Sequence, residues 1–329
     1  MISTLEQFAG NKPVIETVRG WLISGKTPQS IIIEGNEKSG RKTLAHLIAS
    51  GLVCTGNNPP CGQCVQCKKS ISGHPDISNV TGDLSKAAIG VDTIRDLRSD
   101  AFIMPNDSDR KTYIITRTMT VSAQNALLKI IEEPPKGVTF IIIVRNKEDL
   151  LETVRSRSAV LSLLPVGNCE GIVYLKSKFP DINDQKIQTV LERSGGIIGK
   201  AEILLSEKDD NNQIDKMLSE AADALANKNS AAFLAASLPA ENNLNLMESL
   251  TNGLMLILRD AYCKKEGVGN CISGFEKESS VIAKRLPSLE ITKMMDIAKK
   301  ANARVGENPK GSLLVSCLCA RLFDLAESV

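Results

Sequence analysis

The sequence predicts an α/β domain followed by a C-terminal part built only of helices. In the first half, short runs of β-branched residues alternate with stretches in which apolar residues recur at the helical period. After Pro165 no strand-like run follows, and helical periodicity continues to the end of the 329-residue chain. Because regular alternation of strands and helices is typical of a parallel sheet covered on both faces, we predict a doubly wound α/β domain over residues 1–164.

Continuous apolar runs supply the predicted strands of this domain, because a strand buried on both faces needs apolar side chains on each. These runs are Ser30–Ile33, Thr112–Ile115, Thr139–Val144 and Ala159–Leu163. Between them, amphipathic segments predict helices over Lys42–Leu52, Val91–Phe102 and Ser122–Glu132. Pro134 and Pro135 follow the last of these helices and end it, since proline cannot continue a helix.

The helical half is predicted to form two domains. Over residues 165–208, short helical segments are separated by Pro180 and by the pair Gly195-Gly196, which indicates a small helical domain. The polar stretch Lys208–Gln213 is interpreted as a linker, and longer amphipathic segments follow it. We therefore expect an all-helical domain over residues 209–329.

Charge and composition exclude several classes of function. Lys and Arg number 40 against 38 Asp and Glu, so the formal charge is only +2 and any contact with nucleic acid must be a local patch. Aromatic residues make up 3% of the chain, too few for a surface on which rows of bases stack. No apolar run approaches the roughly 18 residues needed to cross a bilayer, and the first residues do not resemble a signal peptide. We expect a cytoplasmic protein.

Four of the nine cysteines are clustered, namely Cys54, Cys61, Cys64 and Cys67. Four thiolates are a tetrahedral ligand set that zinc takes in structural sites, and such a set leaves no position open for a catalytic water. The spacing therefore predicts a structural zinc ion that shapes residues 54–67. An iron–sulfur cluster on four thiolates and four reduced cysteines without a metal are the alternatives.

A phosphate-binding loop follows the first predicted strand, but in altered form. Gly35 and Gly40 have the spacing of the pattern G-x4-G-K-[ST], which joins a strand to a helix and holds phosphates. Arg41 occupies the lysine position and Lys42 the serine or threonine position, so no hydroxyl meets a magnesium ion there. Thr43 does not replace that hydroxyl, because one residue along a helix turns by about 100°. The sequence predicts weak or absent ATP binding.

The strand predicted over Thr112–Ile115 lacks the acidic end that ATP hydrolysis needs. Carboxylates at that place hold magnesium and position water, but Thr116-Arg117-Thr118 follow this strand. With both the metal-binding hydroxyl and the metal-binding carboxylate missing, we predict that the chain does not hydrolyse ATP. Glu132 and Glu133 form another acidic pair at a helix end, but the sequence offers them no obvious partner, and they are interpreted as surface or helix-junction groups.

Two further segments carry a family resemblance. They are Ser122–Pro135, which reads SAQNALLKIIEEPP, and Val154–Ser158, which reads VRSRS. Together with the cysteine cluster and Gly73–Asp76, they resemble the bacterial DNA polymerase III clamp loader. The resemblance covers residues 15–165. It implies an AAA+-like sheet domain over 1–164 with an inserted zinc module at 54–67, a small helical lid over 165–208, and a helical collar for oligomerisation over 209–329.

Within this family the sequence is more similar to the delta-prime type of subunit than to the gamma/tau type. Gamma/tau subunits resemble it but keep an intact phosphate loop and an acidic strand end. The family's two sensor residues fall on Val144 and Gly199, and neither has a polar side chain. Ser156-Arg157-Ser158 is similar to the family's Ser-Arg-Cys motif, with serine in place of the cysteine.

The resemblance implies a stator that catalyses nothing by itself. It would assemble with gamma/tau and delta subunits and offer Arg157 in trans, as an arginine finger, to ATP on a neighbouring subunit. The assembly loads the sliding clamp onto primer-template DNA. Two alternatives stay open: a gamma/tau-type motor subunit, which hydrolyses ATP itself, and a zinc-stabilised nucleic-acid-binding module, which binds DNA alone with a steep salt dependence.

Overall fold

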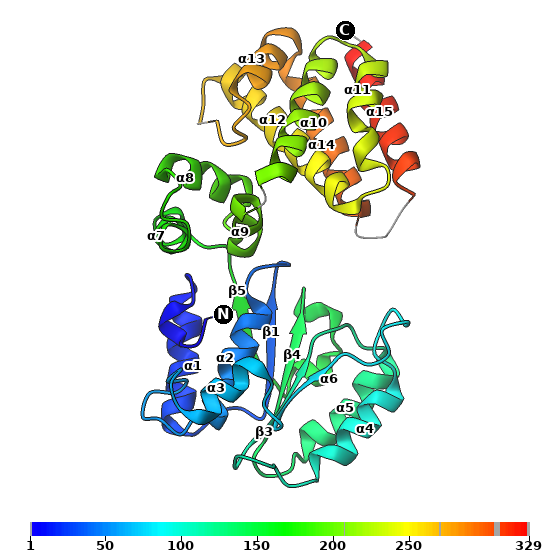
Figure 1. Cartoon of the computed structure of the whole chain (residues 1–329). Coiled ribbons are helices and arrows are strands. Elements are labelled where there is room, and N and C mark those ends of the chain that lie inside the picture. The colour runs from blue at the N-terminus through cyan, green and yellow to red at the C-terminus, as the bar shows by residue number, and fades with distance from the viewer. Residues whose placement is uncertain (1, 207, 270, 306–309, 328–329) are drawn as a thin grey trace. The chain divides into compact units, whose positions relative to one another are not determined.

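The computed structural model describes residues 2–206, 208–269, 271–305 and 310–327 and divides into two compact units (Figure 1). The first unit comprises Met1–Tyr174 together with Ile197–Lys200. The second comprises Leu175–Gly196 and Ala201–Val329. The boundaries predicted near residues 164 and 208 give a finer division than these two units, and they stay predictions.

The first unit contains a five-stranded parallel sheet with the strand order β2-β3-β4-β1-β5. Its strands are β1 (Ser30–Gly35), β2 (Ile77–Val80), β3 (Lys111–Ile115), β4 (Val138–Val144) and β5 (Ala159–Leu163). The predicted α/β class is confirmed, and the apolar runs lie in β1, β3, β4 and β5. The strand β2 was not predicted, because an edge strand is only partly buried and its sequence Ile-Ser-Asn-Val is no continuous apolar run.

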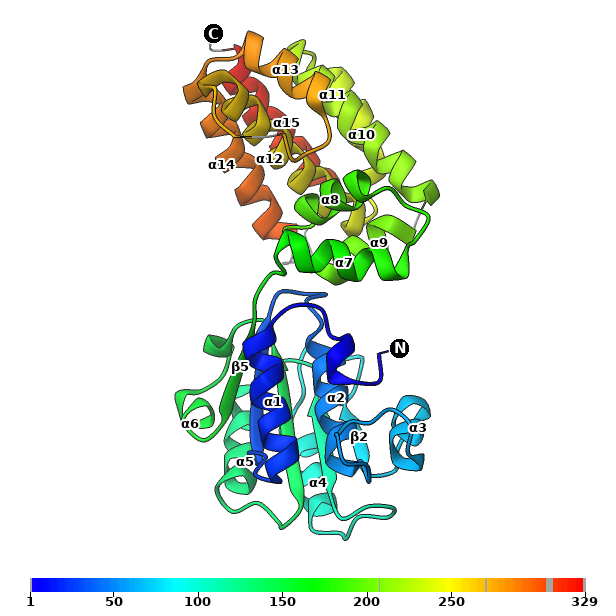
Figure 2. The ribbon, with the colours of Figure 1, turned by 90° about the vertical axis from the view of Figure 1, so that its left-hand side faces the viewer.

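Alternate side chains of β1 face opposite layers of helices. Ile32 packs with residues of α4 and α5, whereas Ile31 and Ile33 pack with residues of α1 and α2. Figures 1 and 2 show these two helix pairs on opposite sides of the sheet. Burial on both faces explains why the strand is apolar without alternation.

The helices of this unit are α1 (Lys12–Ser24), α2 (Arg41–Val53), α3 (Val65–Ser72), α4 (Val91–Ala101), α5 (Val121–Glu132) and α6 (Glu152–Arg155), with 3-10 turns η1 (Leu5–Gln7) and η2 (Lys147–Asp149).

The second unit is helical throughout the part of it that the structure describes. Two helices, α7 (Asn168–Lys178) and α9 (Ile198–Ser206), belong partly to each unit. The other helices of the second unit are α8 (Asp184–Arg193), α10 (Lys208–Ala226), α11 (Ser230–Ser237), η3 (Leu238–Ala240), α12 (Leu244–Glu266), α13 (Glu276–Arg285), α14 (Ser288–Val305) and α15 (Gly311–Glu327). Helices α10 to α15 share one apolar core, in which Leu254 and Met294 are fully buried. Among the described residues no helix has both the length and the apolar character that a membrane span requires.

The linker predicted at Lys208–Gln213 is wrong, because these residues form the first turns of α10. The segment contains neither proline nor glycine. Once an amphipathic helix has formed from Ile214 onward, extending it by a residue is much easier than starting a new one. Polar composition alone therefore did not mark a boundary.

Asp76, just before the edge strand β2, binds the loop that leads into the neighbouring strand β3. Its side chain is 0% exposed, and its carboxylate accepts hydrogen bonds from the backbone N–H groups of Asn106, Asp107 and Ser108 at 2.6, 2.8 and 2.9 Å. The Ser108 hydroxyl donates a further bond to it. Burial raises the pKa of Asp76, but these donors outweigh burial and hold the pKa below its ordinary value.

We expect Asp76→Asn to destabilise the first unit by about 3 kcal/mol, because an amide nitrogen would replace an oxygen that accepts buried N–H groups. The pKa of Asp76 is lower in the folded chain than in the unfolded chain. Its stabilisation is therefore present at pH values above the unfolded pKa and disappears as the pH falls through the folded pKa. The midpoint temperatures of thermal unfolding of wild type and variant should differ at pH 7 and become equal in acid. Exposed Asp109→Asn is the control, and equal stability at pH 7 would contradict the assigned role.

Candidate functional site

The four clustered cysteines lie on the connection between α2 and α3. Cys54 follows the last residue of α2, and Cys64 precedes α3, where its Sγ atom accepts a hydrogen bond from the backbone N–H of Cys67 in the first turn. Cys61 lies in the loop between them. The end of one helix and the start of the next therefore position three of the four sulfur atoms. We call Cys54–Cys67 the knuckle.

The four Sγ atoms are close enough together to bind one metal ion. They all lie within 4.8 Å of one another, with 4.0 Å between Cys61 and Cys67 and 3.9 Å between Cys54 and Cys64. A tetrahedral zinc–thiolate site with bonds of about 2.3 Å has sulfur–sulfur edges of about 3.8 Å. The spacing therefore fits a single tetrahedral ion, and it leaves no room for several irons and their bridging sulfides.

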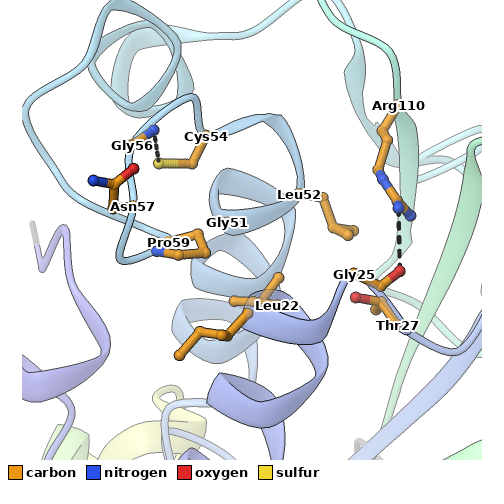
Figure 3. Close-up of a pocket in the computed structure, with 11 residues that line it drawn as sticks. Leu22, Gly25, Thr27, Gly51, Leu52, Cys54, Gly56, Asn57, Pro59 and Arg110 are labelled. Carbon is orange, nitrogen blue, oxygen red and sulfur yellow. Dashed lines mark hydrogen bonds between the residues drawn. The ribbon is translucent and has the colours of Figure 1, made fainter.

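Backbone N–H groups turn toward the sulfur atoms of the knuckle. That of Gly56 donates to Cys54 Sγ at 3.3 Å (Figure 3). That of Cys61 donates to the same sulfur at 3.4 Å, and that of Cys64 donates to Cys61 Sγ at 3.4 Å. A Cβ atom at Gly56 would lie only 2.9 Å from Cys61 Sγ, so glycine is needed for this close approach. These N–H groups stabilise the negative charge that thiolates carry when they bind a metal ion.

The thiols of the knuckle have unequal acidity. Burial raises the pKa of Cys54 to about 12. Burial acts in the same direction on Cys64, but hydrogen bonds from the backbone of Cys67 and Thr55 lower the pKa of Cys64 to about 6. The N–H groups around Cys64 thus favour its thiolate form, which is the form that coordinates a metal ion.

His74 is not a ligand of this site. Its Nδ1 atom accepts a hydrogen bond from the Asp76 backbone N–H at 3.0 Å, and its Nε2 atom is 2.9 Å from the side-chain oxygen of Gln66. Gln66 lies in α3 between two of the cysteines and also donates to the backbone carbonyl of Asp107. His74 and Gln66 therefore connect the knuckle to the buried carboxylate that joins β2 and β3.

A cavity of about 210 Å³ lies beside the knuckle, between the C-terminal ends of α1 and α2 (Figure 3). Its lining includes Cys54, Gly56 and Arg110, and Arg110 donates a hydrogen bond to the Gly25 carbonyl at 3.3 Å. The altered phosphate loop lies at the opposite end of α2, a 13-residue helix about 20 Å long. The cavity is therefore no part of a nucleotide site.

The altered phosphate loop has the predicted backbone context, since it joins the end of β1 to the start of α2. Gly40 caps the helix with a left-handed φ of 95°. Arg41 and Thr43 are half-buried, and Lys42 is exposed. Burial lowers the pKa of Arg41, while Glu37 raises it. The loop thus retains its shape and some positive charge, without the lysine and hydroxyl of the intact pattern.

The backbone of this loop is contacted by Gly199. Gly199 belongs to the short segment that groups with the first unit, and its N–H donates to the Lys38 carbonyl at 3.1 Å. A Cβ atom at Gly199 would lie 2.5 Å from that carbonyl oxygen. No side chain fits at this position unless the backbone moves.

The ends of β3 and β4 carry no carboxylate. Arg117, just after β3, donates to the backbone carbonyls of Thr81 and Asp83 at 2.9 Å each and so holds a loop in place. Val144 ends β4 and is buried. Glu34, near the end of β1, is an acidic residue that the sequence analysis did not single out. It is engaged by the Ser162 hydroxyl at 2.5 Å and by a backbone N–H at 2.9 Å.

Arg157 lies just after α6 and before β5. Its guanidinium donates from Nη1 to the Thr153 carbonyl at 3.2 Å and to the Ser156 hydroxyl at 3.4 Å. Nη2 is 3.0 Å from Oε1 of Glu132, the last residue of α5. These contacts orient the guanidinium from within its own chain. Because the Arg157 side chain is 43% exposed, the guanidinium is still accessible to a partner. Glu132 is a surface group at the end of a helix, as predicted, but it has a partner that the sequence did not reveal, because Arg157 lies 25 positions away.

The sequence of this chain is similar to those of known proteins. Residues 10–167 match the family model described as "DNA polymerase III, delta subunit". The gamma/tau subunit of Mycobacterium tuberculosis DNA polymerase III is 27% identical over 231 residues, which are 67% of this chain and 38% of that protein. The delta' subunit of Bacillus subtilis is 34% identical over 139 residues, which are 41% of this chain and 42% of that protein. The matched part therefore spans less than half the length of these relatives.

A solved structure shows the same fold. It is a DNA polymerase III gamma subunit-related protein from Thermotoga maritima, with a TM-score of 0.52 and 19% sequence identity. The alignment covers 94% of this chain and 99% of that chain. Both units of the chain therefore have counterparts in one solved protein.

Proposed function

Residues 10–167 of this chain belong to the DNA polymerase III clamp-loader family, and on that premise we propose that the chain is a delta-prime-type stator of the loader that does not hydrolyse ATP. One contrast carries the proposal. The chain's own nucleotide site lacks the lysine, hydroxyl and carboxylate that ATP hydrolysis uses, whereas Arg157 is present, exposed and oriented. Such a chain would serve a neighbour's ATP site.

In this proposal the chain assembles with gamma/tau and delta subunits through the helices of its C-terminal half, which act as a collar. Its first unit presents Arg157 to ATP held by an adjacent gamma/tau subunit. The whole assembly opens the sliding clamp and places it on primer-template DNA. These partners would locate the chain in the cytoplasm.

The chemistry of an arginine finger suits Arg157. Its planar and permanently charged guanidinium stabilises negative charge on the transferred phosphoryl group, which Lys does less well. Arginine has five N–H donors, and three contacts are found for Arg157 among the described residues. Donors thus remain for a phosphate oxygen while the side chain stays attached to its own backbone.

The proposed zinc ion would be held by Cys54, Cys61, Cys64 and Cys67. A closed four-thiolate site supplies no catalytic chemistry when its ion is bound. What it supplies is a fixed geometry for the loop between α2 and α3, and, through Gln66 and His74, for the neighbouring segment before β2. We propose a structural role for it.

Nucleotide binding by the purified chain tests the loss of its own site. We expect titration with a fluorescent ATP analogue and magnesium to give no saturable signal up to about 1 mM, at the weak end of ordinary nucleotide affinities. A gamma/tau subunit from the same organism is the positive control. Micromolar binding together with release of phosphate by the chain alone would overturn the stator proposal.

The second candidate function is that of a gamma/tau-type motor subunit, which hydrolyses ATP itself. It is favoured by the M. tuberculosis gamma/tau relative, which matches 67% of this chain, against 41% for the B. subtilis delta' relative. It predicts ATP binding and hydrolysis in the experiment above. The altered residues at positions 41 and 42 and the absence of an acidic residue at positions 116–118 argue against it. A nucleic-acid-binding module is less well supported still, because a formal charge of +2 predicts little binding of DNA by the isolated chain.

A further inference from the structure

We infer that Glu132 is a positioning residue for the Arg157 guanidinium, and that it holds the fork in the orientation in which it meets the neighbouring subunit's nucleotide. The inference rests on the proposed function of Arg157 and assigns a role to a second residue of the same site. It follows from the contacts around the guanidinium, and not from the charge of Glu132 alone.

The guanidinium is held at both of its terminal nitrogens by two different elements. Nη2 pairs with Glu132 Oε1 at 3.0 Å, at the C-terminal end of α5. Nη1 donates to the Thr153 carbonyl at 3.2 Å, in α6. Because a planar fork held at two separate points cannot rotate freely, the direction of its remaining N–H donors is set before any phosphate arrives.

The two elements are joined by contacts that do not involve Glu132. The side-chain oxygen of Gln124, in α5, accepts a hydrogen bond from the Leu151 backbone N–H at 2.7 Å, at the start of α6. Val154 of α6 and Ile130 of α5 are buried in the same core. Loss of the Glu132 carboxylate should therefore leave the backbone of both elements in place and release only the guanidinium.

The ion pair contributes little to folding, which leaves orientation as its main effect. Glu132 is 48% exposed and Arg157 is 43% exposed, and ion pairs at such exposure add little to stability. Glu133, the next residue, is also exposed, and no contact with Arg157 is found for it among the described residues. The two adjacent carboxylates thus differ in this contact, so Glu133 provides a matched control.

The test uses the loader assembled from this chain, gamma/tau and delta, with clamp and primed DNA. We expect Glu132→Gln and Glu132→Ala to lower the kcat of clamp-stimulated ATP hydrolysis by about threefold to tenfold, with the KM for ATP little changed, because misdirected donors weaken only the transition state. Glu133→Gln should leave kcat at the wild-type value. Assembly by size-exclusion chromatography and thermal unfolding should be the same for all variants.

A double-mutant cycle with Arg157→Ala separates the two claims. If Glu132 acts through Arg157, Glu132→Ala adds no further loss in the Arg157→Ala background. A loss from Arg157→Ala with none from Glu132→Ala would overturn the positioning role and leave the proposed function intact. No loss from Arg157→Ala would instead overturn the proposed function. An increase on Glu132→Ala, or an equal loss in both backgrounds, would also overturn the positioning role.

Discussion

Replacing Arg157 by alanine is expected to abolish most of the ATP turnover at the neighbouring site that we propose this chain completes in the loader. An arginine finger supplied in trans is worth about 10³- to 10⁵-fold in the rate of phosphoryl transfer. The fold should be unaffected, because the guanidinium is 43% exposed and its removal leaves no buried charge without a partner. Steady-state ATP hydrolysis by the assembled loader, with and without clamp and primed DNA, measures the effect.

Arg157→Lys is the informative companion. Lysine keeps the positive charge but not the planar fork, so it should rescue only a small part of the lost rate. Full activity in the lysine variant would show that charge alone matters. Wild-type turnover in the alanine variant, in a loader shown to contain this chain, would contradict the finger role altogether.

Loss of the zinc ion that we propose for the knuckle is expected to have the largest effect on the structure of the chain. Structural zinc sites of this kind bind with an apparent free energy on the order of 10 kcal/mol, and that free energy is coupled to folding. Cys64→Ser should eliminate bound zinc and expose residues 54–72 to solvent, because the same residue also caps α3. Zinc content by mass spectrometry and amide hydrogen exchange over α3 are the measurements.

Cys169→Ser is the matched control for this experiment, because Cys169 is an exposed cysteine outside the cluster. It should retain one zinc ion per chain and wild-type exchange rates. Loss of zinc from both variants would show that the loss does not depend on the thiol of Cys64. Retention of zinc and slow exchange in Cys64→Ser would contradict the four-thiolate site.

Much of the first unit could be predicted because its central strands β1, β3 and β4 are buried on both faces. Ile31, Ile32 and Ile33 have to be apolar wherever the flanking helices lie, so the run is visible without knowing the fold. The knuckle was visible for a similar reason, since ligand type and short spacing are local properties. The edge strand β2 was missed because partial burial leaves no such pattern.

The helical half was harder to divide. The polar start of α10 was mistaken for a linker, because composition does not show whether a helix continues into polar residues. Helix propagation depends on neighbouring backbone hydrogen bonds, which a local count of polar residues does not capture.

Residue identity was sufficient for the chemistry that depends on a few neighbouring positions: the four thiols, the altered phosphate loop and the strand end without a carboxylate. Contacts between distant segments were not accessible in this way. The ion pair of Glu132 with Arg157 and the approach of Gly199 to Lys38 exist only because packing brings together residues that are far apart along the chain. Such pairings depend on the burial of whole helices and strands, and therefore on the complete fold.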